Sequence, residues 1–66
     1  MKLRIKEQIE DNTTHTLYIK DDAQYLPNID ECVLVEYEGK HIKLKITDIT
    51  LNYINNTITA IGYRIS

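Results

Sequence analysis

The sequence predicts an all-β fold: one small, five-stranded antiparallel sheet that is strongly bent or forms an open barrel. Apolar and polar residues alternate over most of the chain, which is the period of strands with one buried face. Short segments containing Gly, Asn or Asp separate the alternating runs, as expected for hairpin turns. With 66 residues, the chain is expected to form one domain, residues 1–66, around a thin core.

The first predicted hairpin joins the alternating runs 1–9 and 15–20. Glu7 is the one charged residue at an inward position of the first run. The apolar residues expected on the buried face are Leu3, Ile5, Ile9, Leu17 and Ile19.

The length of the loop decides the register of this hairpin. A three-residue loop at 11–13 pairs Ile5 with Ile19, whereas a two-residue loop pairs Ile5 with Tyr18. A slip of one residue turns the apolar face of a strand toward water. We therefore predict the three-residue loop, which keeps both apolar sets together.

Residues 21–31 lose the alternation and carry a helix N-cap candidate, one turn of helical pattern and a proline stop. We predict an excursion loop whose apolar residues pack beneath the sheet as a lid. The alternative is a binding loop, since long loops on rigid scaffolds often carry function. The residues expected in the lid are Tyr25, Leu26 and Ile29.

The central hairpin folds about Glu38-Gly39, where glycine supplies the positive φ that a two-residue turn requires. This turn pairs Val35 with Ile42 and gathers the apolar residues on one side. By the same register, Val33 faces Leu44. The opposite side carries Cys32, Leu34, Glu36, His41, Lys43 and Lys45.

The last hairpin, residues 49–65, closes at Asn55-Asn56, because asparagine tolerates the left-handed backbone. After Ile46 the apolar residues change from even to odd positions, namely 49, 51 and 53. In the partner run they change in the same way, from positions 58 and 60 to 61, 63 and 65. Matched phase changes predict a bulge or bend in both strands. Gly62 fits the corner of such a bend.

Composition argues against several function classes. A net charge of −2 and a pI near 5.5 differ from the clearly basic balance of a general polyanion binder. The single cysteine, Cys32, excludes an internal disulfide, and no Cys/His cluster offers zinc ligands. His15 and His41 lie on different hairpins without a nucleophile beside them, and no Gly-rich phosphate loop is present. We therefore expect no enzymatic activity, no cofactor and no metal.

The first residues alternate charge with apolar side chains and contain no continuous apolar stretch. This pattern differs from a signal peptide and from a spanning helix. We therefore expect a cytoplasmic protein with no membrane partner.

The best candidate binding surface follows from the three-residue loop, which sets Lys6 opposite Tyr18 and Arg4 opposite Lys20. Cations neutralise phosphates and an aromatic ring stacks on bases, so the surface could hold single-stranded nucleic acid or another anionic partner. The alternative is a solvated face whose lysines discourage edge pairing. The patch comprises Lys2, Arg4, Lys6, Tyr18 and Lys20.

The opposite pole is acidic and could steer a protein partner, since charge complementarity sets specificity and association rate. It comprises Asp21, Asp22, Asp30, Glu31, Glu36 and Glu38. Aromatic residues are common anchors of interfaces. The tyrosines expected to be exposed for this purpose are Tyr18, Tyr25 and Tyr37.

Residues 26–40, the bent strand after them and the hairpin at 53–58 resemble small accessory proteins of phages and prophages of low-GC Gram-positive bacteria. They also resemble the entry strand of SH3-like small barrels, although Asp30-Glu31 stands where a Gly-Asp pair is frequent there. The resemblance implies a non-enzymatic binding role in the cytoplasm of a bacterial host cell, such as a host-takeover or anti-defence factor. It assigns no catalytic or ligand residue.

The leading functional hypothesis is a protein-binding module that inhibits a bacterial protein by occluding it. The alternative is a small barrel that binds single-stranded nucleic acid or a nucleotide, and a third is a structural component of a virion. The exposed strand edges are compatible with a homodimer. SH3-like and OB-like strand orders both fit the pattern.

Overall fold

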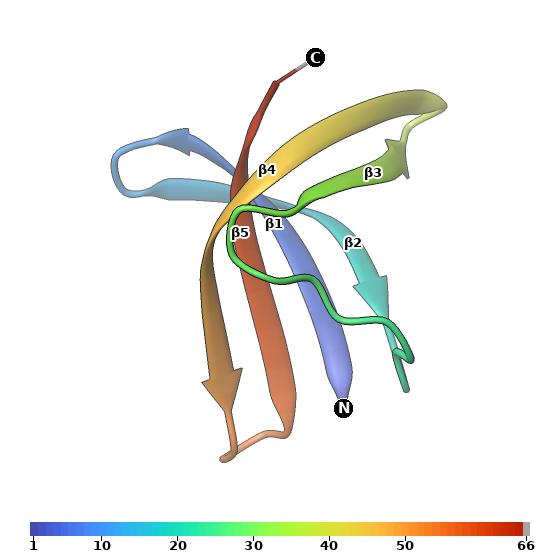
Figure 1. Ribbon diagram of the computed structural model, residues 1–66, viewed down its shortest axis with the longest axis vertical. Helices are drawn as coiled ribbons and strands as arrows, with labels where there is room; N and C mark the ends of the chain where they lie inside the picture. The colour runs from blue at the N-terminus through green and yellow to red at the C-terminus, as the bar shows by residue number, and fades with distance from the viewer. Residues whose placement is uncertain (66) are drawn as a thin grey trace.

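Alternating residues form five strands in the computed structural model, which describes residues 1–65. The strands are β1 (Lys2–Glu10), β2 (Thr13–Lys20), β3 (Cys32–Tyr37), β4 (Lys40–Asn52) and β5 (Thr57–Arg64). They make one sheet in the order β2-β1-β5-β4-β3 (Figure 1). The predicted fold class, a bent five-stranded sheet forming a small open barrel, is confirmed.

The sheet curls into a half-barrel, with the β1–β2 and β3–β4 hairpins bending to opposite sides of the central strands (Figure 1). The core fills the concave side and includes residues from all five strands. Its buried apolar residues are Leu3, Ile5, Leu17, Val35, Ile42, Leu44, Ile46, Ile58 and Ala60. Within the described residues, no helix is long and apolar enough to cross a membrane.

One pairing differs from the antiparallel sheet that the sequence predicts. The strands β1 and β5 are parallel, with Leu3 beside Ile58 and Ile5 beside Ala60. The other three pairings are antiparallel. A hairpin turn forces its two strands to be antiparallel, but β1 and β5 are joined by no turn, so their direction is set by the closure of the whole sheet.

The register predicted for the first hairpin is wrong. The loop has two residues, 11 and 12, and Ile5 pairs with Tyr18. The ladder contains two register shifts, one between Ile5 and Lys6 and one between Gln8 and Glu10. Because a bulge changes which side of the sheet the following residues face, Leu17 is buried without the three-residue loop. The prediction assumed a ladder without bulges.

The two bulges also explain which inward residues were predicted wrongly. Leu3, Ile5 and Leu17 are buried as expected, but Ile9 and Ile19 are exposed. Ile9 is the unpaired residue of the second shift, and Ile19 lies beyond the first shift, counted from the turn, where it pairs with the outward-facing Arg4.

The predicted lid is also wrong. Tyr25 is 88% exposed, and Leu26 and Ile29 are exposed as well. Pro27 is the buried residue of the loop, and the Ala23 N–H donates to the carbonyl oxygen of Met1 at 3.3 Å. Small residues therefore anchor the loop to the core, and its larger apolar side chains face solvent.

The central hairpin has the predicted register, with Val33 opposite Leu44 and Val35 opposite Ile42. Glu38 and Gly39 both have positive φ, 50° and 77°. Two positive φ values define the type I′ turn, whose twist matches that of the flanking strands.

The bend in β4 is confirmed by a register shift between Ile46 and Asp48. The matching change predicted for β5 is wrong, because its buried residues continue at even positions through Ala60 to Gly62. The change is unnecessary since Gly62 has no side chain and lets β4 approach closely. A Cβ at this position would lie 2.4 Å from the carbonyl oxygen of Lys45.

The β4–β5 loop, residues 53–56, is organised by asparagines. The side-chain oxygen of Asn52 accepts hydrogen bonds from the backbone N–H groups of Ile54 and Asn55. Asn56 has φ 60°, so the predicted left-handed asparagine is confirmed.

The tip of the β4–β5 loop is apolar and exposed. Ile54 is 98% exposed, and the structure places Tyr53 there too, although the sequence predicted it to face inward.

The inward-facing carboxylate of Glu7 is neutralised by Arg64, from the other end of the chain. The Glu7 side chain is only 13% exposed, as its inward position predicts. Arg64 donates to it from Nε at 3.0 Å and from Nη2 at 2.9 Å. This bidentate pair fastens the end of β1 to the end of β5.

Candidate partner-binding groove

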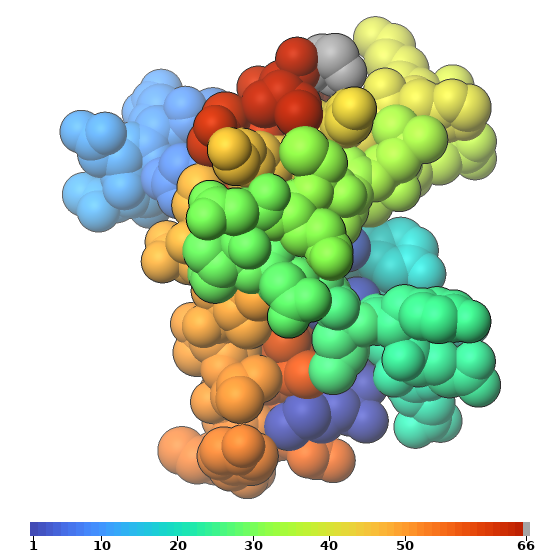
Figure 2. Space-filling model, in the orientation of Figure 1, coloured from blue at the N-terminus to red at the C-terminus, as the bar shows by residue number. Residues whose placement is uncertain are grey.

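The candidate site lies at the open seam of the half-barrel. The strands β2 and β3 are the two edges of the sheet, and each pairs with only one neighbour. Between them lies an open groove of about 840 Å³, bordered by the loop 21–31 that connects the two edges. Figure 2 shows this loop on the near face of the molecule, in front of the strands.

The floor of the groove is apolar and continuous with the core. Leu3 and Ile5 of β1 lie on one side of it and Val35 of β3 on the other. An apolar floor with a few polar groups at its rim is the usual construction of a binding site.

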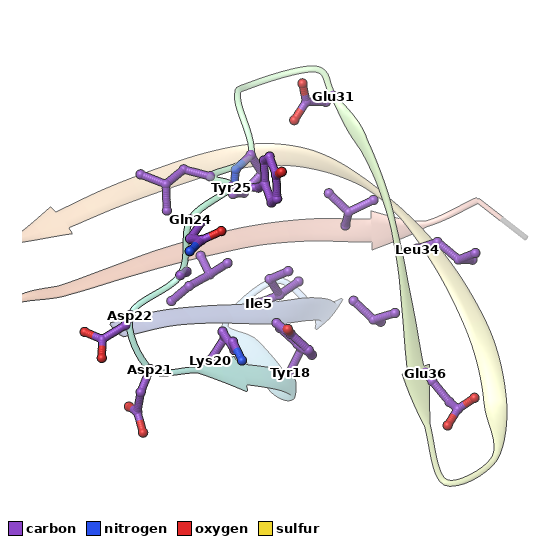
Figure 3. A pocket seen from close by; sticks show the side chains of 16 residues that line it. Ile5, Tyr18, Lys20, Asp21, Asp22, Gln24, Tyr25, Glu31, Leu34 and Glu36 are labelled. Atoms are coloured by element: carbon purple, nitrogen blue, oxygen red, sulfur yellow. The ribbon is translucent and has the colours of Figure 1, made fainter. Parts of the chain in front are cut away.

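Two tyrosines stand along the groove. Tyr18 pairs with Ile5, and directly paired residues share a face of the sheet, so its ring lies on the concave side. Tyr25 comes from the loop and is largely exposed at the mouth (Figure 3). Both were candidate anchors in the sequence, and the structure brings them to the same groove.

The predicted basic patch is divided between two faces. Tyr18 and Lys20 line the groove, because they pair with Ile5 and Leu3. Arg4 pairs with Ile19 and therefore lies on the convex side. The single patch depended on the three-residue loop, so it is lost with the corrected register.

The three cations left on the convex side are Lys2, Arg4 and Lys6. Lys2 lies 3.7 Å from the carboxylate of Asp21. Arg4 is half-buried, and its Nε has no hydrogen-bond partner among residues 1–65. This face therefore offers a phosphate chain less free charge than the sequence suggested.

Tyr37, the third candidate anchor, closes one end of the seam. Its hydroxyl lies 3.1 Å from Nε2 of His15 in β2, and the two rings meet edge to face with centroids 5.1 Å apart. The sequence could not reveal this contact, because His15 and Tyr37 belong to different hairpins whose relative placement no local pattern determines.

We expect Tyr37→Phe to lower the free energy of unfolding by about 1 kcal/mol, because it removes this hydrogen bond but keeps the ring. Urea denaturation measures the change. Tyr63→Phe is the matched control, since the Tyr63 hydroxyl has no hydrogen-bond partner within the described residues. Equal effects of the two substitutions would contradict a closing role for Tyr37.

The rim of the groove is acidic. Four carboxylates of the predicted acidic pole line it, together with one cation, Lys20. They are Asp21, Asp22, Glu31 and Glu36. The excess of negative charge favours a basic partner over an anionic one.

No group of three or more metal-ligating side chains comes together within residues 1–65. No protein-family model, curated protein or solved structure matches this chain. The groove and the two strand edges are therefore the features from which a function can be inferred.

Proposed function

We propose that the protein is a non-enzymatic binding module that takes part of a partner protein into the groove between β2 and β3. The observation that carries the proposal is the open seam, in which two unpaired strand edges border an apolar floor. Such edges are templates for pairing with another chain.

Three properties of the groove support a protein partner. The floor supplies apolar contact area, and Tyr18 and Tyr25 supply aromatic groups of the kind that dominate binding energy. The acidic rim supplies specificity and steering. A partner seated here would have its own surface covered, which is the physical basis of inhibition by occlusion.

The resemblance to phage accessory proteins suggests one form of this function, in which the occluded partner is a bacterial protein in the host cytoplasm. The nucleic-acid alternative has weaker support, because phosphates would meet acidic groups in the groove, and of the predicted basic patch only Lys2, Arg4 and Lys6 lie on the convex side. A virion component would be recognised by stable self-assembly.

Affinity capture of the tagged protein from a lysate of a low-GC Gram-positive bacterium, with and without nuclease, tests the proposal. We expect one stoichiometric protein that survives nuclease treatment. Tyr25→Ala should reduce its recovery about tenfold, the equivalent of one good aromatic contact. The substitution leaves the fold intact because Tyr25 is almost fully exposed.

Ile54→Ser is the control, since it removes an apolar side chain that is even more exposed and does not line the groove. Loss of the partner with Ile54→Ser but not with Tyr25→Ala would move the interface to the β4–β5 tip. Captured material that disappears after nuclease treatment would instead favour nucleic-acid binding by the convex basic face.

A further inference from the structure

We infer that the groove binds its partner as an extended segment that adds a strand to the open edge of β3, and that this segment alternates apolar with basic residues. The inference rests on the proposed function and specifies the chemistry of the partner. It follows from the backbone of β3, the protection of the two edges and the charges at the rim.

The turn determines which backbone groups of β3 are free. In a two-residue hairpin the residues that flank the turn, here Tyr37 and Lys40, exchange both hydrogen bonds. Every second residue of β3 before Tyr37 therefore bonds to β4. The same alternation continues past the strand, where the Ile46 N–H donates to the carbonyl oxygen of Glu31 at 2.9 Å.

The residues between these positions, Cys32, Leu34 and Glu36, consequently point their backbone N–H and C=O groups away from β4. They point toward the seam. This accounts for the presence of Leu34 and Glu36 along the groove, although alternation along the strand puts their side chains on the side of the sheet opposite Val35.

The β3 edge lacks the usual protection against strand addition. Natural edge strands carry lysine, proline or bulges that block pairing. The sequence of β3 contains neither lysine nor proline and has Glu36 as its one charged residue, its register with β4 is unbroken, and Leu34 is 67% exposed. The other edge, β2, is interrupted by the register shift between Ile5 and Lys6. A new strand therefore finds a regular ladder only on β3.

The side chains around the seam define the segment. Residues of an added strand that pair with Val33 and Val35 would face the apolar floor beside Ile5 and Tyr18, so they should be apolar. The four carboxylates at the rim outnumber the two cations beside them, Lys20 and the Lys2 that lies 3.7 Å from Asp21, so the remaining residues should be basic.

A second copy of this chain fits this requirement poorly. In a symmetric pairing of two β3 edges, each strand would present Glu36 and no lysine or arginine to the acidic rim of the other. A basic segment of a different protein supplies the missing charge. Strand addition of this kind gains affinity from main-chain hydrogen bonds and specificity from alternate side chains.

Titration of the 66-residue protein with short synthetic peptides, followed by amide NMR, tests the inference. The probe alternates lysine and valine; a second peptide replaces lysine by glutamate, and a third carries N-methyl groups on alternate peptide bonds. We expect saturable binding of the probe, at least about tenfold weaker binding of the other two, and slower amide exchange at Leu34 and Glu36.

Two variants at one position separate the backbone from the side chain. Leu34→Pro removes the N–H that faces the seam and should reduce probe affinity at least about tenfold, whereas Leu34→Ala keeps that N–H and should reduce it less. If Leu34→Pro fails to fold, the N-methylated peptide decides the same question.

Absence of saturable binding, equal affinity for the glutamate peptide, full binding of the N-methylated peptide, or shifts confined to the convex face would each overturn the inference. So would a homodimer through β3. If the peptides fail but capture of a protein still depends on Tyr25, strand addition is wrong and the proposed function stands. If capture also fails, both are wrong.

Discussion

Gly62→Ala is expected to lower the free energy of unfolding by about 3 kcal/mol, near the upper end of the cost of overpacking. The added Cβ would lie 2.4 Å from the carbonyl oxygen of Lys45 and 2.9 Å from its carbonyl carbon. Both atoms belong to the backbone, so no side-chain rotation relieves the overlap. The strands β4 and β5 would have to separate at the bulge after Ile46, next to the most deeply buried part of the core.

Gly39→Ala is the matched control for this prediction. A Cβ at Gly39 meets no atom within 4 Å, but its φ of +77° is unfavourable for alanine, so we expect a loss of about 1 kcal/mol. Both substitutions replace glycine by alanine and change the entropy of the unfolded chain alike. The difference between the two losses in the free energy of unfolding, measured by urea denaturation, gives the cost of the overlap with β4. Equal losses would show that the bend does not need glycine at position 62.

Local signals predicted the parts of this fold that lie within one hairpin. The pairing of Val35 with Ile42 follows from the turn at Glu38-Gly39 and from matched alternation on both sides, because turn type and register constrain each other over a few residues. The inward position of Glu7 was visible for the same reason. Its partner Arg64 was not, since 57 residues separate them.

The first hairpin shows where such reasoning fails. Each of the two bulges shifts the register of the ladder by one residue. Leu17 is therefore buried although the loop has two residues, a length that simple alternation rules out. Alternation counts residues and cannot detect an unpaired one. The misplacement of Ile9 and Ile19 and the division of the basic patch all follow from this single difference.

The groove could not be predicted as a site because it is made by curvature rather than by any motif. The sequence predicts both Tyr18 and Tyr25 as anchors, but only the curl of the sheet brings β2 toward β3 and sets the two rings along one seam. The acidic pole was predicted from loop positions. Four of its carboxylates border an apolar floor in the structure, so the acidic pole becomes the rim of a candidate binding groove.

Arg64→Ala is expected to destabilise the protein by about 2–3 kcal/mol, and Glu7→Ala by less, about 1–2 kcal/mol. The asymmetry follows from exposure. Removing Arg64 leaves a carboxylate whose side chain is only 13% exposed, whereas removing Glu7 leaves an arginine whose side chain is 50% exposed and can bind water. Breaking an ion pair costs most when the partner left behind is the buried one.

Urea denaturation of the two single variants and the double variant measures this asymmetry and the coupling between the residues. The double variant should cost less than the sum of the single losses, because it leaves no unpaired charge. Arg64→Lys is the control that keeps the charge but loses the bidentate geometry, and it should recover only part of the loss. Additive single effects, or a larger loss for Glu7→Ala, would contradict the role of this pair in joining β1 to β5. That role matters for binding as well, since the parallel β1–β5 pair is what connects the two hairpins whose free edges form the groove.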